Sequence, residues 1–151
     1  MRSALPDGDE AGQKVTHRFL PHTADIKVAF ETDTLEALFV EATEVMRGLL
    51  AGTSPVELRE ERLLELECPD IAELFLAYLK ELVYLFAANG FLVAAVGIDR
   101  VDQTQLVARV RGEGLDAKRH EHQPEVKAVT RHDFMVENRE GRWFADVVFD
   151  V

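Results

Sequence analysis

Apolar and polar residues follow one another along the last part of the chain in a pattern that predicts a β-hairpin. Residues 126–137 and 142–151 are rich in β-branched and aromatic side chains, and the polar loop at 138–141 contains the glycine that a tight return needs. A strand of this kind would hold Asp150 and the α-carboxylate of Val151 in place. Two fixed anionic groups side by side suggest a cation site, although a surface strand can also end on an aspartate that has no such role.

Two longer segments have apolar residues at helical spacing. They run from position 35 to 50 and from position 71 to 86. Asp33 and Asp70 each stand three residues before a glutamate, which is the spacing of a capping box at the start of a helix. Gly90 predicts a left-handed cap at the end of the second helix. The apolar stripe of that helix covers much of its circumference, so we expect it to form the core of the domain.

The other apolar segments predict strands, and their order predicts the fold class. Extended patterns occur at 15–20, at 26–30, within 56–68, at 91–101 and at 105–112. With the C-terminal hairpin, the order is strand, strand, helix, strand, helix and then four strands in two hairpins. Because this is not a regular alternation of strands and helices, we predict an α+β fold, a single domain with a mixed, largely antiparallel sheet and two main helices.

Composition and charge narrow the classes of function. The chain has 151 residues, of which 47% are hydrophobic, and a formal net charge of −11. Residues 1–14 offer little to bury, so we expect a flexible extension followed by one domain at 15–151. The negative charge disfavours a non-specific grip on nucleic acid or an anionic membrane, so a protein or a cation is the better partner.

The sequence also argues against several compartments and chemistries. The single cysteine, Cys68, excludes an internal disulfide and a multi-cysteine zinc cluster, and its apolar surroundings indicate a structural thiol. We find neither a signal-peptide pattern nor an apolar run long enough to span a membrane, so we expect a cytoplasmic protein. Glycine-rich phosphate loops and nucleophile elbows are also missing from the sequence.

Two polar segments carry candidate ligands. The first follows Pro21 and reads His22-Thr-Ala-Asp25, a bend that presents short polar side chains together. It suits a ligand-bearing loop, and the alternative is a plain turn in which Asp25 or Thr23 bonds its own backbone. The second is the His-Glu-His run at 120–122, whose imidazoles could bind a transition metal, although no complete set of four ligands is visible.

Three separated motifs together resemble the archease family, the small protein cofactors of RtcB-type RNA ligases. These motifs are His22-Thr-Ala-Asp25, Lys127-Ala-Val-Thr with His132 shortly after it, and the segment from Trp143 to Asp150-Val151. The resemblance covers residues 17–151. It also includes the Leu- and Tyr-rich segment at 73–85, the Gly-Glu pair at 112–113 and the histidine at position 120.

The resemblance implies a non-catalytic activator with a divalent-cation site. Archeases promote guanylylation and multiple turnover of the ligase in tRNA splicing and RNA repair. Carried over by position, Asp25 and Asp150 are the expected metal-binding carboxylates, with Val151 beside them. Lys127 and His22 are the expected functional residues. Because oxygen ligands suit hard cations, we expect Ca²⁺, with Mg²⁺ as the alternative. The expected partner is the ligase itself rather than RNA.

The sequence departs from the family pattern in a few places and leaves other functions open. Arg131 stands where the family usually has an aromatic residue, Lys80 replaces a small polar residue, and residues 1–14 have no counterpart. A small metal-dependent hydrolase could instead pair His22 with Asp25, or the histidine at position 120 with Asp150. A chaperone-like binding module with exposed apolar surface is a third hypothesis.

Overall fold

The computed structural model describes residues 25–121, 123 and 125–151. Within these residues, two helices and six strands follow one another in the order β1 (Asp25–Thr32), α1 (Leu35–Ala51), β2 (Glu60–Glu67), α2 (Ile71–Asn89), β3 (Phe91–Val101), β4 (Gln105–Gly114), β5 (Ala128–Arg139) and β6 (Arg142–Asp150). Each predicted element within this part of the chain is present. The strand predicted at 15–20 and the extension expected at 1–14 lie outside the described residues.

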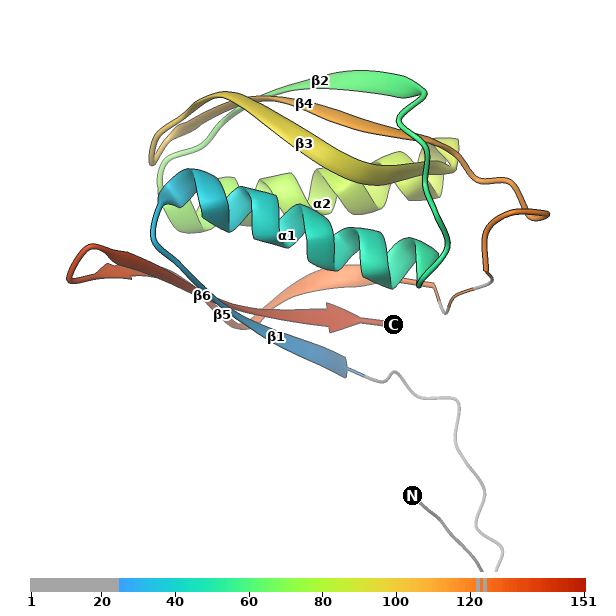
Figure 1. Ribbon diagram of the computed structural model, residues 1–151. Coiled ribbons are helices and arrows are strands. Elements are labelled where there is room, and N and C mark those ends of the chain that lie inside the picture. Colours follow the sequence, from blue (N-terminus) through green and yellow to red (C-terminus); the bar gives the residue numbers. More distant parts are fainter. Residues whose placement is uncertain (1–24, 122, 124) are drawn as a thin grey trace, which may run out of the picture.

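The strands form two sheets with the helices between them. Sheet A has the order β1-β6-β5 and sheet B the order β2-β4-β3. All pairings within both sheets are antiparallel. Figure 1 shows α1 and α2 as a middle layer, with sheet B on one side and sheet A on the other. The predicted α+β class with two helices is therefore confirmed, and the strands divide into two sheets where we expected one.

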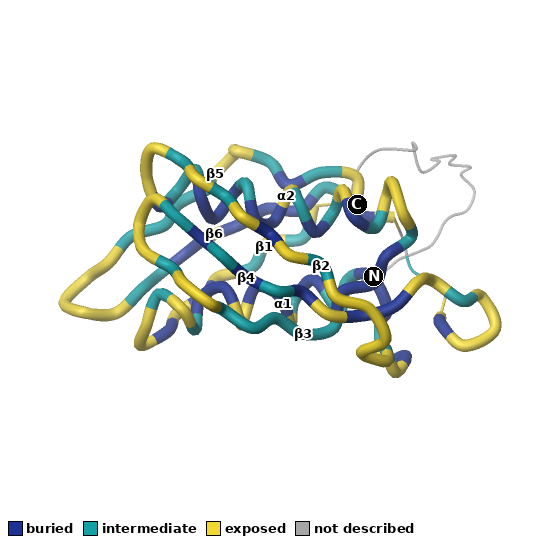
Figure 2. The backbone as a smooth tube through the Cα atoms, turned by 90° about the horizontal axis from the view of Figure 1, so that it is seen from above, coloured by how far each residue is buried: buried dark blue, intermediate teal, exposed yellow. Residues whose placement is uncertain are grey.

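The apolar circumference of α2 explains this three-layer arrangement. Leu74, Phe75, Tyr78 and Leu79 have no exposed surface, and with the buried Leu76 they cover roughly half of the helix circumference. A buried face this wide contacts strands of both sheets, β5 on one side and β3 on the other, while Lys80 and Tyr84 remain exposed on the opposite side of the helix. Figure 2 shows the buried residues running through the centre of the molecule, with exposed residues in the turns. The prediction that this helix forms the core is confirmed.

The two helix starts differ in how well the sequence predicted them. Asp70 is the N-cap of α2, as expected, and accepts a hydrogen bond from the N–H of Glu73 at 2.9 Å. In α1, however, the N-cap is Thr34, whose hydroxyl accepts from the N–H of Ala37. The expected cap, Asp33, lies one residue too early and instead pairs with Arg142 of β6. At the end of α2, Gly90 takes the predicted left-handed conformation.

Two irregular features shape the C-terminal hairpin. Its turn is Glu140-Gly141, with positive φ at both residues, so the loop is two residues shorter than predicted. The register also shifts within β5, because Thr130 pairs with Val148 while Met135 pairs with Asp146. The four residues at 131–134 therefore form a bulge opposite the single residue Val147 of β6. Neither described helix is long and apolar enough to cross a membrane.

Candidate functional site

Asp25 and Asp150 lie directly opposite each other in sheet A. Asp25 opens β1, Asp150 closes β6, and the antiparallel register makes them cross-strand partners. Such partners place their side chains on the same face of a sheet, with Cβ atoms about 5 Å apart. The fold thus brings together two carboxylates that the sequence placed at opposite ends of the predicted domain.

The carboxylate of Asp150 has an unusual environment. Its Oδ1 atom is buried, and it has no hydrogen-bond partner among the described residues. Buried polar atoms are nearly always paired, since leaving one unpaired costs about 1–3 kcal/mol. The Asp25 side chain, by contrast, belongs to an exposed residue. A cation would offset the cost of burying an unpaired carboxylate oxygen, so the chemistry of this pair fits a cation ligand.

Of the other predicted site residues, the structure describes Lys127 and Val151. The N–H of Lys127 donates to the carbonyl oxygen of Asp150 at 2.7 Å, which fixes Lys127 beside the carboxylate pair. Val151 is half-buried and packs against the core next to Asp150. His22 lies outside the described residues. The structure therefore gathers Asp25, Lys127, Asp150 and Val151 at one end of sheet A.

The carboxylate pair supplies only part of a cation's coordination shell. In the described part of the chain, no group of three or more His, Cys, Asp or Glu side chains is arranged to hold a metal ion. Further ligands would have to be backbone carbonyls, water or groups outside that part. Such a mixed oxygen shell is acceptable to Ca²⁺, which takes six to eight oxygen ligands in flexible geometry.

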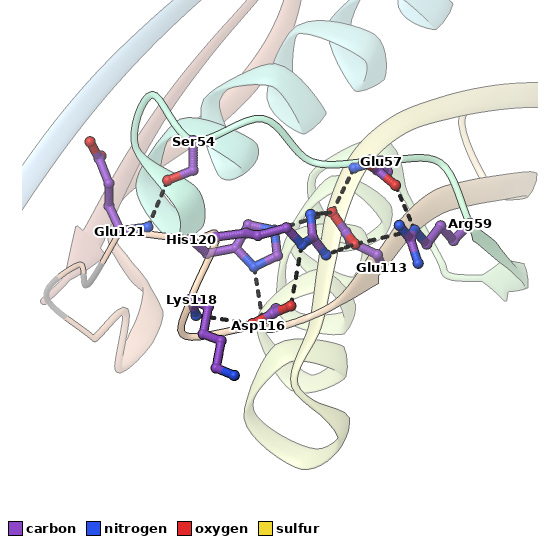
Figure 3. Close-up of polar contacts among 9 residues, drawn as sticks. Ser54, Glu57, Arg59, Glu113, Asp116, Lys118, His120 and Glu121 are labelled. Carbon is purple, nitrogen blue, oxygen red and sulfur yellow. Dashed lines mark hydrogen bonds and ion pairs between the residues drawn. The ribbon is translucent and has the colours of Figure 1, made fainter.

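A second group of charged residues surrounds Glu113 at the end of β4 (Figure 3). The Glu113 side chain is only 3% exposed. It accepts hydrogen bonds from the Arg119 guanidinium at 3.1 Å and from the N–H of Glu57 at 2.7 Å. Nε2 of His120 lies 3.1 Å from the same carboxylate. These donors, Arg119 foremost, lower the pKa of Glu113 from 4.5 to about 2 even though burial opposes the shift.

His120 is held from both sides of its ring. Its Nδ1 accepts a hydrogen bond from the N–H of Asp116 at 2.8 Å. The ring proton of a neutral imidazole is then on Nε2, where it is donated to Glu113. Both nitrogens are therefore used within the cluster. The pairing of His120 with Asp150 that a hydrolase would need is not formed, which is a correction to that hypothesis.

The rest of the His-Glu-His run also has a structural role where it is described. The N–H of Glu121 donates to the hydroxyl of Ser54 at 2.7 Å (Figure 3). The Glu121 carboxylate also accepts from the hydroxyl of Thr53. His122 lies outside the described residues. These bonds tie the segment after β4 to the end of α1. Among the described residues, His120 and Glu121 belong to no group of three or more potential metal ligands.

Glu113, Arg119, His120 and the N–H of Glu57 form a group, here called the Glu113 cluster, that the sequence did not predict. The alternation of β4 hides it, because Glu113 falls on the same set of positions as Arg109 and Arg111, where a charged side chain is expected. Arg119 and His120 follow within one short loop. A buried glutamate followed closely by an arginine and a histidine predicts a paired charge.

Comparisons with known proteins agree with the sequence resemblance. Residues 17–151 match the model of the archease protein family. An archease of Methanopyrus kandleri is 34% identical, over 87% of this chain and 96% of its own length. One from Thermococcus gammatolerans is 36% identical, over 86% and 94% respectively.

Solved structures show the same fold. The solution structure of Methanobacterium thermoautotrophicum protein 1598 is 31% identical, with a TM-score of 0.68, and the match covers 87% of this chain and 96% of that one. The crystal structure of a Thermotoga maritima archease, described as a possible chaperone, matches with a TM-score of 0.66 at 21% identity, over 92% and 100%. This second likeness concerns the fold alone.

Proposed function

This chain belongs to the archease protein family, and from that membership we propose that it is a non-catalytic activator of an RtcB-type RNA ligase. In this role it promotes guanylylation and multiple turnover of the ligase in tRNA splicing and RNA repair. The observation that carries the proposal is the placement of Asp25 opposite Asp150, with a buried Asp150 oxygen that lacks a partner among the described residues. Such an atom is suited to binding rather than to holding the fold together.

A divalent cation, with Ca²⁺ preferred over Mg²⁺, is the proposed ligand of this pair. Asp25 and Asp150 would bind it through oxygen, with the α-carboxylate of Val151 as a third proposed ligand. When bound, the cation supplies a positive charge that attracts phosphate oxygens. The backbone N–H of Lys127 donates to the carbonyl oxygen of Asp150, and the Lys127 ammonium would add a second positive charge.

The acidity of the chain argues for contact with the ligase. With a net charge of −11, the protein would be repelled by RNA at most orientations. A ligase that binds RNA and guanosine triphosphate must carry positive charge near its active site, which would attract an acidic protein. We therefore place the carboxylate pair and Lys127 towards the guanylylation site of the ligase, with no contact to RNA required.

The test is a multiple-turnover ligation assay with the cognate ligase, Ca²⁺ or Mg²⁺, and substoichiometric amounts of this protein. Asp25→Ala, Lys127→Ala and Asp150→Ala should each lose most of the stimulation, whereas Glu65→Gln on sheet B should keep it. Guanylylation of the ligase, followed separately, should show the same order. If the wild-type protein does not stimulate, the proposed function is wrong; if all three variants stimulate fully, the proposed site is wrong.

A further inference from the structure

Sheet A has an outer face, turned away from the helices, that carries more than the carboxylate pair. Val147 and Phe149 of β6 belong to the core, so the alternating residues Asp146, Val148 and Asp150 point to the outer face. Asp25 is on the same face because it is the cross-strand partner of Asp150. Val148 is only 3% exposed although it lies outside the core cluster, so it is covered from this outer side.

An ion pair crosses the central strand above Val148. Lys27 of β1 is the register partner of Val148, and its amino group lies 3.6 Å from the carboxylate of Asp133 in the bulge of β5. His132 contacts the same carboxylate at 3.2 Å. Asp133 has a φ of 55°, in the left-handed region, and so turns its side chain out of the regular strand pattern. The bulge therefore extends over the face of the sheet.

A groove of about 540 Å³ is formed beside this ion pair. Its floor is apolar and includes Val148, Met135 and Ala29, and the carboxylates of Asp133 and Asp146 line it. Lys27 is its single cationic lining residue among those described, and its ammonium is already paired with Asp133. The groove is continuous with the face that carries Asp25 and Asp150. An apolar floor with excess negative charge is the complement of a ligand that is apolar and basic.

We propose that this groove is a docking site for a segment of the ligase that carries a basic side chain next to an apolar one. The inference rests on the proposed function, because it takes the ligase as the partner. The basic side chain would lie between Asp133 and Asp146, and the apolar one would cover Met135 and the exposed Ala29. Docking here would place the ligase directly beside the carboxylate pair.

The Lys27–Asp133 ion pair allows us to predict whether a change in the groove strengthens or weakens binding of the ligase. The two side chains are 69% and 57% exposed, so the pair is weak and can be displaced. A basic segment would compete with Lys27 for Asp133, so removing the Lys27 charge should tighten binding. An anionic ligand, such as a nucleotide or a phosphate backbone, would use Lys27 and would be repelled by Asp146. An anionic ligand would therefore bind more weakly to Lys27→Gln and more tightly to Asp146→Asn.

The experiment measures the dissociation constant of the cognate ligase for this protein at two salt concentrations. The variants are Asp146→Asn, Lys27→Gln and the double variant Asp133→Asn/Asp146→Asn, in which asparagine also tolerates the left-handed backbone at position 133. Glu65→Gln on sheet B matches the charge change of Asp146→Asn, and Lys80→Gln on α2 matches that of Lys27→Gln. Cation binding by each variant, followed calorimetrically with Ca²⁺, shows whether the neighbouring carboxylate pair is intact.

We expect the double variant to bind the ligase about tenfold more weakly and Lys27→Gln to bind it a few-fold more tightly, with both controls unchanged. Raising the salt concentration should reduce the difference between the double variant and the wild type. Tighter binding of the double variant, or unchanged binding of all groove variants by a protein that still activates the ligase, overturns the docking inference alone. Failure of the wild-type protein to bind the ligase overturns the inference and the proposed function together.

Discussion

Glu113 and Asp150 are both at the ends of strands, yet their carboxylates have opposite surroundings. Glu113 is buried among donors from Arg119, His120 and the backbone of Glu57. Asp150 buries an oxygen that has no donor among the described residues. A satisfied carboxylate holds parts of a protein together, whereas an unsatisfied one raises the energy of the fold until something binds it. Burial alone would not have separated these two roles.

The two groups also lie in different parts of the molecule. The Glu113 cluster ties the loop after β4 to the segment before β2, so its contacts are made inside one sheet and its adjoining loops. The Asp25/Asp150 pair is on the outer face of sheet A, where the Asp25 residue is exposed. An acidic protein thus uses one buried carboxylate for stability and, as we propose, another for binding. Four measurements would test this distinction.

The largest effect should come from Glu113→Ala. This change leaves the Arg119 charge and the N–H groups of His120 and Glu57 without their acceptor, and breaking a buried charged pair costs about 3 kcal/mol. Urea unfolding followed by circular dichroism would measure the lower free energy of unfolding. Glu113→Gln, which keeps an acceptor oxygen, should lose less. A Glu113→Ala protein as stable as the wild type would show that the cluster does not hold the loop.

Part of that loss should also appear in acid. The pKa of Glu113 is about 2 in the folded protein against an ordinary value of 4.5, so its contribution is complete above pH 4.5 and is lost as the pH falls towards 2. The stability of the wild type should therefore fall more steeply over this range than that of Glu113→Gln. Unfolding curves at intervals between pH 5 and pH 2.5 would show it, and parallel slopes for the two proteins would contradict it.

A moderate and opposite effect is expected at Asp150. Without Ca²⁺, Asp150→Asn should be at least as stable as the wild type, because the variant no longer buries a charged oxygen without a donor. With Ca²⁺ at about ten times its dissociation constant, the wild type should gain about 1.4 kcal/mol and the variant nothing. Thermal unfolding with Ca²⁺ or a chelator tests this, with Asp146→Asn as the control. A variant that responds to Ca²⁺ like the wild type would remove Asp150 from the site.

The smallest effect should follow the loss of an exposed ion pair. Arg131 donates two hydrogen bonds to Glu73, at 2.6 and 2.9 Å, and lowers the pKa of that carboxyl, but both side chains face solvent. Salt and water screen such a pair, so Arg131→Gln should leave the urea midpoint within experimental error. A loss close to that of Glu113→Ala would mean that the bidentate geometry, rather than burial, determines the strength of these contacts.

Most of the elements could be predicted from the sequence because their patterns are local. The helices at 35–51 and 71–89 and the hairpins follow from spacing, caps and turn residues. The assignment of strands to two sheets could not be read in the same way, because it depends on which faces of α2 need cover. The cap of α1 was also misplaced by one residue, since Thr34 and Asp33 are both good caps and only the ion pair of Asp33 with Arg142 separates them.

The candidate site was predictable in part, for a related reason. Asp150 could be singled out from its place at the end of an apolar strand, but its juxtaposition with Asp25 is a matter of register between distant strands. The sequence does not predict the Glu113 cluster, because Glu113 at the end of β4 contacts Glu57, which lies in the distant segment before β2, as well as Arg119 and His120 in the following loop. The bulge at 131–134 was likewise hidden in a segment that reads as a regular strand.

The pairing of β1 with β6 also has a consequence for the order in which the protein folds. The first and last described strands are neighbours in sheet A, so their contact closes a loop that contains both helices and all of sheet B. Closing so long a loop is entropically costly and is expected late in folding, after the local hairpins and helices have formed. On the ribosome, Asp25 must therefore wait for Asp150 to emerge. A cation bound by both would join two strands that are far apart in the sequence, and nascent or truncated chains that lack Asp150 could not acquire it.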